Sequence, residues 1–388
     1  MSESMIPKEF SLANRQLHLV DLTLRDGEQT AGVVFAQGEK VRIAKLLDAV
    51  GVGFIEVGIP SLGEEEQRSI RAIADAKLRA KLIALCRPNL DEIKLSAECG
   101  VNAVTVSIST SEVHLKSKLK KSRRWVLKSL TAAIEEARRL GLEVTASAED
   151  SSRTDLDFLI QFAKTAKEAG AVRMRFCDTL SVLSPFQTYE VVEKLVSAVD
   201  IDIEMHTHND FGMATANVLA GIRAGANYIT VSINGLGERT GNAALEEVVM
   251  ALKYLHYIDL GIPTKRFREL AEYVAEASGR AIPVWKAIVG NNVFAHESGI
   301  HADGVIKNPR NYEIFPPEEV GLTRQLVVGK HSGSHTIIHK FREFGIDLSQ
   351  HEASEILALA RTMAVEQKRA LFDKELMYIY NDYRHSKV

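Results

Sequence analysis

The sequence predicts an α/β protein built around a (β/α)8 barrel, because three features of its first two-thirds agree. Short β-branched runs recur eight times, a stretch with helical periodicity follows each run, and several of these stretches end in glycine. The eight runs are 17–23, 53–58, 81–86, 103–109, 143–149, 172–178, 202–208 and 228–234. A doubly wound open sheet is the alternative, but the even spacing and the lack of a glycine-rich dinucleotide turn after the first run favour the barrel.

The helical stretches have the expected amphipathic pattern. Apolar residues recur at steps of three and four in 40–53, and 124–142 and 157–171 repeat the pattern. Residues 243–258 would close the eighth unit, after which the pattern changes to loops and further helices. We therefore expect an N-terminal extension over 1–16, the barrel over 17–258 and a C-terminal appendage over 259–388.

Composition excludes several classes of protein. The chain has 388 residues, 46% of them hydrophobic, and a net charge of -3, which is typical of a globular protein and gives no sign of nucleic-acid or membrane binding. It has no secretory leader pattern and no apolar run of the roughly 18 residues that a membrane helix needs. Three cysteines without metal-site spacing indicate a reduced, cytoplasmic setting.

The barrel predicts where the chemistry lies, since active sites of this fold form at the carboxyl ends of the strands. Asp26 follows the first run, and His206 and His208 end the seventh. Residues i and i+2 of a strand face the same side, so both imidazoles can point to the barrel axis near Asp26. We expect these three side chains, with Asn242 as an oxygen donor, to bind a divalent cation such as Mg²⁺, Mn²⁺ or Zn²⁺. The alternative is hydrogen-bonded histidines without a metal.

Other polar side chains fall at the same end of the barrel. Arg25 adjoins the predicted ligand and can stabilise a developing oxyanion, or it forms a structural ion pair with Glu28 or Glu56. Glu149 ends the fifth run and Thr179 follows the sixth, and either can serve chemistry or merely hold loops. The basic stretch 116–124 is more typical of a solvated helix start than of a phosphate site.

The appendage carries a second group of polar residues. His296 and His301 are spaced as HxxxxH, but nothing nearby completes a second tetrahedral metal site. His301 is a candidate for proton transfer at a barrel mouth, and a turn-stabilising role is the alternative.

Five motifs, in order, resemble one family. They are DLTLRDGEQ (21–29), HTHNDFGMATAN (206–217), NGLGERTGNAALEE (234–247), HESGIHADG (296–304) and GKHSG (329–333). The chain is similar to the isopropylmalate, citramalate and homocitrate synthases, metal-dependent barrel enzymes, from about residue 17 to 345. About 40 residues follow the last motif, so we expect no long regulatory domain. This length, with segments 56–66, 84–87 and 149–153, most resembles the nitrogenase-type homocitrate synthases.

The resemblance implies a function and roles for residues. The reaction would condense acetyl-CoA with 2-oxoglutarate in a homodimer whose appendages, residues 281–334, cross over. The implied metal ligands are Asp26, His206, His208 and Asn242, and the implied catalytic residues are Arg25, Glu149 and His301. The implied substrate-binding residues are Gln29, Glu56, Arg87, Asn89, Ser147, Thr179 and Tyr312.

One departure from the family bears on the substrate. Lysine-pathway homocitrate synthases have an Arg-x-Ser-x-Glu pattern on strand five, and here those positions are Thr145, Ser147 and Glu149. The arginine that helps to bind the distal carboxylate is missing, so Arg87 or Asn89 would take its place, or the substrate is another 2-oxo acid.

Two further functions compete. The barrel also resembles hydroxymethylglutaryl-CoA lyases, but these carry a cysteine near strand eight, and the loop 234–242 has none. A non-catalytic metal-binding scaffold is the other possibility, and the complete set of polar residues argues against it.

Overall fold

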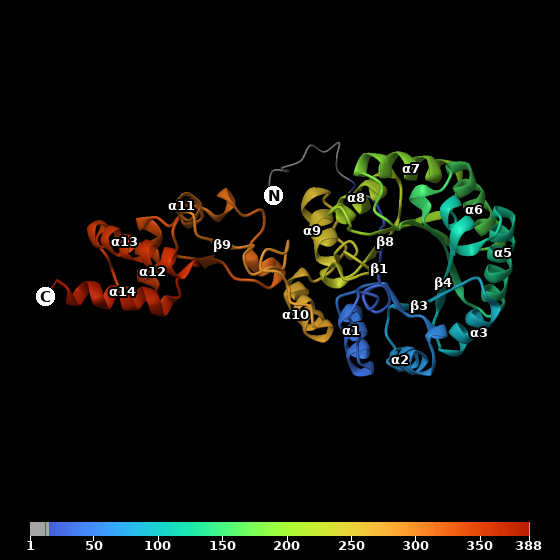
Figure 1. Cartoon of the computed structure of the whole chain (residues 1–388), viewed down its shortest axis with the longest axis horizontal. Helices are drawn as coiled ribbons and strands as arrows, with labels where there is room; N and C mark the ends of the chain where they lie inside the picture. The colour runs from blue at the N-terminus through green and yellow to red at the C-terminus, as the bar shows by residue number, and fades with distance from the viewer. Residues whose placement is uncertain (1–11, 13–14, 388) are drawn as a thin grey trace. The chain divides into compact units, whose positions relative to one another are not determined.

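The structure is a computed structural model that describes residues 12 and 15–387, so the predicted extension over 1–16 lies almost wholly outside the described residues. The described chain divides into two compact units between Ala281 and Ile282. The first unit contains eight parallel strands that close into a barrel in sequence order (Figure 1), which confirms the predicted (β/α)8 fold.

The strands are β1 (His18–Asp21), β2 (Phe54–Gly58), β3 (Lys81–Cys86), β4 (Ala103–Ser109), β5 (Glu143–Glu149), β6 (Arg173–Asp178), β7 (Asp202–Thr207) and β8 (Tyr228–Val231). The main helices of this unit are α1 (Gln37–Ala49), α2 (Glu64–Asp75), α3 (Leu90–Glu98), α5 (Arg123–Arg139), α6 (Leu156–Ala169), α7 (Pro185–Ala198), α8 (Ala214–Ala224), α9 (Leu245–Leu255) and α10 (Phe267–Ser278). Shorter helices are η2 (Pro60–Leu62), α4 (Glu112–His114), the π-helix η3 (Leu115–Leu119), η4 (Ser151–Arg153), η5 (Ile233–Gly235) and η6 (Thr264–Arg266).

Local sequence signals explain where the helices begin and end. The side chain of Ser122 accepts a hydrogen bond from the backbone N–H of Trp125 at the start of α5, and Asp155 caps α6 in the same way. Gly170 ends α6 with a φ of 101°, a left-handed conformation that glycine adopts without steric cost. The Gly170 turn lets the chain pass within a few residues from α6 to β6.

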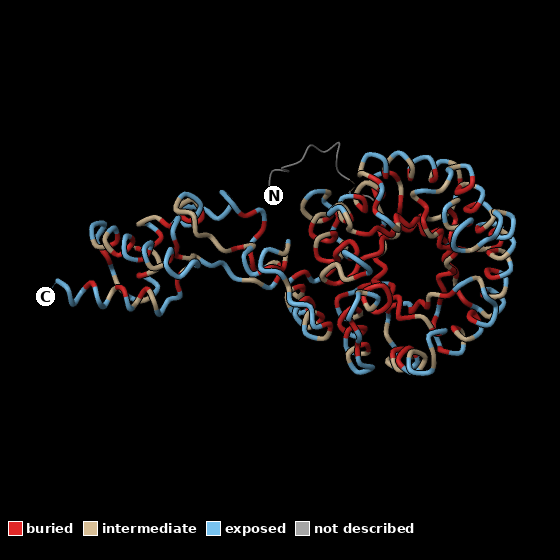
Figure 2. Tube along the Cα trace, viewed as in Figure 1, coloured by how far each residue is buried: buried red, intermediate tan, exposed pale blue. Residues whose placement is uncertain are grey.

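The strands are buried on both faces, because the helices cover the outside and side chains fill the inside. Figure 2 shows the buried ring of strands inside a ring of helices whose outer faces are exposed. One apolar cluster lies within the ring and consists of Val20, Leu22, Phe54, Ile83 and Ala103. The guanidinium of Arg173 lies over the Phe54 and Tyr228 rings, 4.9 and 4.6 Å from their centroids. Phe54, Arg173 and Tyr228 are the first residues of their strands, so they fill the amino-terminal end of the barrel.

The first compact unit extends beyond residue 258, where the sequence pattern changes. Helix α10 packs against α1 and η5, so its apolar face belongs to this unit. The second unit contains β9 (Ala295–His296), α11 (Gly299–Lys307), η7 (Pro309–Asn311), η8 (Pro317–Val320), β10 (Gln325–Leu326), α12 (Ser334–Glu343), α13 (Gln350–Gln367) and α14 (Asp373–His385). Its core includes Ile337, Phe341, Ile356, Leu376 and Ile379. Within the described chain, no helix has the length and apolar character to cross a membrane.

Candidate metal centre

The structure brings together the three predicted metal ligands at the carboxyl end of the barrel. Asp26 follows β1, His206 lies on β7 and His208 follows it, and all three are buried. One ligand atom from each lies within 4.8 Å of the others. The imidazole centroids are 4.8 Å apart with an interplanar angle of 73°. A carboxylate and two imidazoles form a mixed oxygen and nitrogen site of the kind that divalent transition metals occupy.

Neighbouring groups orient this cluster and leave donor atoms free for a cation. Nδ1 of His206 is 3.0 Å from the Thr230 hydroxyl, so Nε2 remains to bind. The Asn242 amide donates to Oδ2 of Asp26 at 2.7 Å. Nδ1 of His208 and Oδ1 of Asn242 are buried without a hydrogen-bond partner. Buried polar atoms seldom lack partners, and two such atoms beside the cluster fit a site that holds a metal ion.

The charge states of the three ligands suit metal binding. Burial would raise the pKa of Asp26, but Arg25 and the two histidines outweigh burial and hold that pKa below its ordinary value. Burial lowers the pKa of His206 and of His208, the former well below its usual range. Asp26 is therefore an anion and the imidazoles are neutral near pH 7, which are the protonation states that ligands need.

Arg25 forms the structural ion pair considered for it, and its guanidinium also contacts the predicted metal ligand Asp26. Its Nη1 lies 2.6 Å from Oδ1 of Asp26 and 3.1 Å from Oε1 of Gln29, while its Nε donates to Oε2 of Glu56 at 2.6 Å. The structural partner is thus Glu56, since Glu28 pairs with Lys40 at 2.5 Å. An arginine anchored on one side by Glu56 presents its other side to the cluster.

Two arginines of β6 belong to the same network, and the sequence analysis missed them. Arg175 is buried and contacts both Glu56 and Glu204, and Arg173 contacts Glu204 from the amino-terminal side. The signal was an Arg-x-Arg pair inside a strand that should be buried on both faces, where a charged side chain needs an ionic partner.

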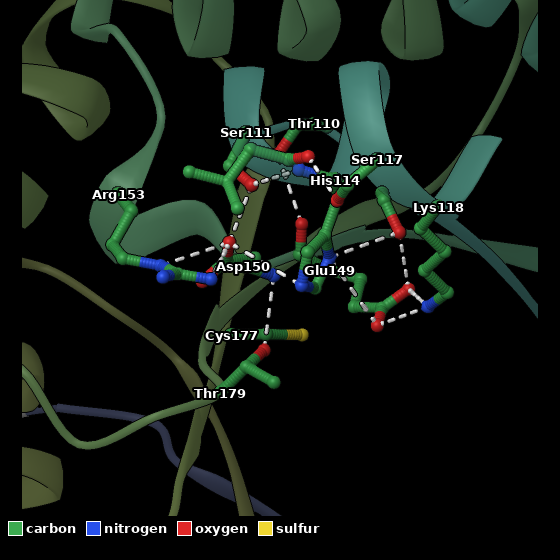
Figure 3. Close-up of polar contacts among 12 residues, drawn as sticks. Thr110, Ser111, His114, Ser117, Lys118, Glu149, Asp150, Arg153, Cys177 and Thr179 are labelled. Atoms are coloured by element: carbon green, nitrogen blue, oxygen red, sulfur yellow. Dashed lines mark hydrogen bonds and ion pairs between the residues drawn. The ribbon is translucent and has the colours of Figure 1, made fainter. Parts of the chain in front are cut away.

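Glu149 lies in a second polar cluster, which Figure 3 shows, between the ends of β4 and β5. Lys118 donates to both carboxylate oxygens of Glu149, at 2.6 and 2.8 Å, and the Ser109 hydroxyl donates to it at 2.5 Å. Nδ1 of His114 lies 3.6 Å from Glu149, and Nε2 lies 3.7 Å from Asp150. The sequence analysis placed Lys118 in a stretch typical of a solvated helix start and did not single out His114, whereas residues 115–119 form a π-helical turn that returns to β5.

The other predicted substrate-binding residues on the barrel have local partners. Thr179 accepts a hydrogen bond from the backbone N–H of Asp150 at 2.9 Å, and Ser147 lies 3.4 Å from the Cys177 sulfur. Nε of Arg87 donates to Glu92 at 2.7 Å. Asn89 caps α3 by accepting from the backbone N–H groups of residues 91 and 92. Arg87 and Asn89 thus stabilise the start of α3, and the structure shows neither among the groups that surround the metal ligands.

A cavity of about 370 Å³ opens beside Arg25. Gln29, Val34, Phe35, Ile59 and Leu62 are among its lining residues. Glu28, Glu65 and Glu66 also line it, so the cavity has a mixed polar and apolar wall.

The second unit holds the remaining predicted residues. The rings of His301 and Tyr312 lie 4.3 Å apart between centroids, and His296 contacts Glu313 at 3.2 Å. Among the described residues, Asp26, His206 and His208 form the sole cluster of three or more potential ligands, so the HxxxxH spacing forms no second centre there.

Comparisons with known proteins identify the family of the chain. The HMGL-like family matches residues 16–274, and the family described as "Homocitrate synthase post-HMGL domain-like" matches residues 288–368. The chain is 59% identical over 369 residues to 2-isopropylmalate synthase 2 of Caldanaerobacter subterraneus subsp. tengcongensis, covering 95% of this chain and 96% of that protein. It is 52% identical to homocitrate synthase 1 of Nostoc sp., covering 94% and 97% of the two chains.

Among solved structures, the HMG-CoA lyase of Bacillus subtilis has a TM-score of 0.64 at 23% identity, covering 70% of this chain and 96% of that one, a likeness of fold. The chain belongs to the HMGL-like family, and within it to the group of 2-isopropylmalate, homocitrate and citramalate synthases.

Proposed function

We propose that the protein condenses acetyl-CoA with 2-oxoglutarate and hydrolyses the thioester, which yields homocitrate and CoA. The observation that carries this proposal is the buried Asp26–His206–His208 cluster with Arg25 beside it at the barrel's carboxyl end. A divalent cation bound there supplies Lewis-acid polarisation of the 2-oxo acid's ketone. Arg25 directs N–H groups at the same place, where negative charge develops as the new carbon–carbon bond forms.

Glu149 is the proposed base that takes a proton from the acetyl methyl group. A positioned base typically contributes about 10²–10⁴-fold to the rate. The Lys118 ammonium and the Ser109 hydroxyl fix the Glu149 carboxylate, which is only partly exposed at the mouth of the barrel. Attack on the ketone then joins the two carbons, and water cleaves the thioester to release CoA, which makes the reaction irreversible.

We also propose that the protein acts as a homodimer in which His301 and Tyr312 complete the site of the partner subunit. The two rings contact each other and both side chains are exposed, so both are accessible to another subunit. A His301→Ala change should then lower turnover far more than affinity for the 2-oxo acid. Unchanged turnover would remove His301 from the chemistry.

The inner wall between β4 and β5 supports a substrate with a polar side chain. Thr105 and Ser147 face the interior, because Thr105 contacts Arg175 and Ser147 contacts Cys177. Side chains alternate along a strand, so Ser107 and Ser109 share this face with Thr105. Ser109 is held by Glu149 and Thr105 by Arg175, so the Ser107 and Ser147 hydroxyls are the groups that can donate hydrogen bonds to a distal carboxylate, which an isopropyl group could not accept. These hydroxyls replace Arg87 and Asn89 as the groups that we propose to meet that carboxylate.

Isopropylmalate or citramalate synthesis is the second candidate, because the relative that is 59% identical over nearly the whole chain is a 2-isopropylmalate synthase. An acyl-CoA lyase is less favoured. The solved lyases share the fold at 18–24% identity, and the loop 234–242 has no cysteine.

One assay separates these functions. Thiol release from acetyl-CoA is measured with 2-oxoglutarate, 2-oxoisovalerate and pyruvate, and cleavage of hydroxymethylglutaryl-CoA is measured in parallel. We expect the highest kcat/KM with 2-oxoglutarate, and a Glu149→Gln variant should lose most of it. A higher kcat/KM with 2-oxoisovalerate or pyruvate would show that 2-oxoglutarate is not the preferred substrate. Cleavage of hydroxymethylglutaryl-CoA without condensation would show that the protein is a lyase.

A further inference from the structure

Alternating charges form a continuous chain through the barrel. From the carboxyl end it runs through Asp26, Arg25, Glu56, Arg175, Glu204, Arg173, Glu143 and Lys81. Each member contacts the next, from the predicted metal ligand to a partly exposed lysine at the amino-terminal end. Six of the eight side chains, from Asp26 to Arg173, are buried. Buried ion pairs of this kind are costly to desolvate and are weak evidence for stability alone, so their arrangement calls for another explanation.

Arg175 is the member that joins the two halves of this chain. Its Nη2 and Nη1 lie 2.9 and 3.3 Å from Oε1 and Oε2 of Glu56, and its Nε donates to Glu204. Arg25 reaches Oε2 of the same Glu56 carboxylate. Burial would raise the pKa of Glu56, but Arg175 first and Arg25 second lower it to about 2. Glu56 therefore stays anionic, and both arginines hold its carboxylate in place.

We propose that Arg175 is a positioning residue: through Glu56 it holds the guanidinium of Arg25 at the orientation in which Nη1 faces the metal ligand Asp26. Without Arg175, the buried Glu56 carboxylate lacks its bidentate partner and either takes up a proton or moves. Arg25 then loses its anchor and turns further onto Asp26, where it competes with the cation. The part of this inference that concerns the 2-oxo acid rests on the proposed function, while the part that concerns the cation does not.

Arg173 provides a matched control for Arg175. Both arginines lie on β6, both are about 1% exposed, and both contact Glu204. Arg173 contacts Glu143 instead of Glu56 and lies at the end of the barrel remote from Asp26. A general loss of packing or of buried charge should affect both variants, whereas a positioning role should separate them.

The test compares Arg175→Met with Arg173→Met in the full chain. Two readouts are used: the Kd of Mn²⁺ by calorimetry, and kcat and KM for 2-oxoglutarate by thiol release. A displacement of about 1 Å near the reacting groups typically costs about 10²-fold, so we expect Arg175→Met to weaken Mn²⁺ at least tenfold and to lower kcat/KM by about 10²-fold. Arg173→Met should change the Mn²⁺ Kd and kcat/KM by less than about threefold. The two variants are compared at temperatures that lie equally far below their own Tm values.

Two further variants keep the inference testable if Arg175→Met does not fold. Arg175→Met/Glu204→Gln removes one positive and one negative charge and still leaves Glu56 without a second arginine, so it should show the same defect. Arg175→Lys supplies a point charge that cannot bridge both glutamates and should recover only part of the loss. The role of Arg175 would be overturned if Arg175→Met and Arg173→Met changed the Mn²⁺ Kd equally. It would also be overturned if the double variant bound Mn²⁺ with the wild-type Kd. Absence of condensation in the wild type would overturn the proposed function and leave the Mn²⁺ comparison valid.

Discussion

Gly237 lies so close to the predicted metal ligands that a single methyl group there should disturb them. A Cβ at this position would be 2.5 Å from Nδ2 of Asn242 and 2.9 Å from Oδ2 of Asp26. Ordinary contact begins at 3.4 Å, so the Asn242 amide must retreat by about 0.9 Å. The loop cannot easily yield, because Thr30 bonds both the N–H and the carbonyl oxygen of Gly237, at 3.0 and 2.8 Å. The φ of Gly237 is not positive, so alanine fits the backbone.

A Gly237→Ala change should therefore damage the site more than the fold. We expect about a 10²-fold loss in kcat/KM, together with weaker Mn²⁺ binding, from a shift of this size. Overpacking should cost about 1–3 kcal/mol of folding stability. Gly53→Ala is the matched control, because no heavy atom lies within 4 Å of its added Cβ and its φ is also not positive. Calorimetric Mn²⁺ titration and thiol release test both variants. A Gly237→Ala protein with wild-type Kd and turnover would show that the added methyl group does not disturb Asp26 and Asn242.

Three other predictions follow from burial and ligation. His208→Ala should lose Mn²⁺ binding and turnover together, and activity that survives in chelator-treated buffer would contradict a metal role. Burial raises the pKa of Asp21 to about 7, so the folded state keeps a proton that the unfolded state releases above about pH 4. The folding stability should then fall as pH rises from about 4 to 7, and Asp21→Asn should flatten this part of the plot of Tm against pH. Parallel plots for the wild type and the variant would show that Asp21 does not titrate in this range. Cys86, Cys99 and Cys177 are buried with raised pKa values, so a thiol reagent should label the native protein only as fast as it unfolds, and rapid labelling would contradict their burial.

The fold and the clustering of the three candidate metal ligands could be predicted because both depend on short-range patterns. Strand and helix periodicity gave the eight units, and the rule that chemistry lies at strand carboxyl ends selected Asp26, His206 and His208. Their convergence needs no knowledge of side-chain pairing, since β1 and β7 both pair with β8.

The buried ion network could not be predicted, because its partners are far apart in sequence. Glu56 and Arg175 are separated by 119 residues, and no local pattern links them. The family's strand-five arginine is absent, and Arg175 lies beside Ser147 on the next strand, yet its N–H groups are directed at Glu56 and Glu204. Only the structure shows that this arginine is not free for a substrate.

The boundary of the barrel unit has a similar explanation. The amphipathic pattern of α10 predicts a helix, but the surface that covers its apolar face is formed by α1 and η5, which are distant in sequence. A change of pattern at residue 259 therefore marked the end of the strand–helix repeat and not the end of the compact unit.

The central claim is that Asp26, His206 and His208 hold one divalent cation. The most direct measurement is an anomalous difference map from crystals grown with Mn²⁺. We expect a single peak in this cluster, about 2.0–2.3 Å from a donor atom of each of the three side chains. A map with no peak there at saturating Mn²⁺, or with a peak bound by other residues, would contradict it.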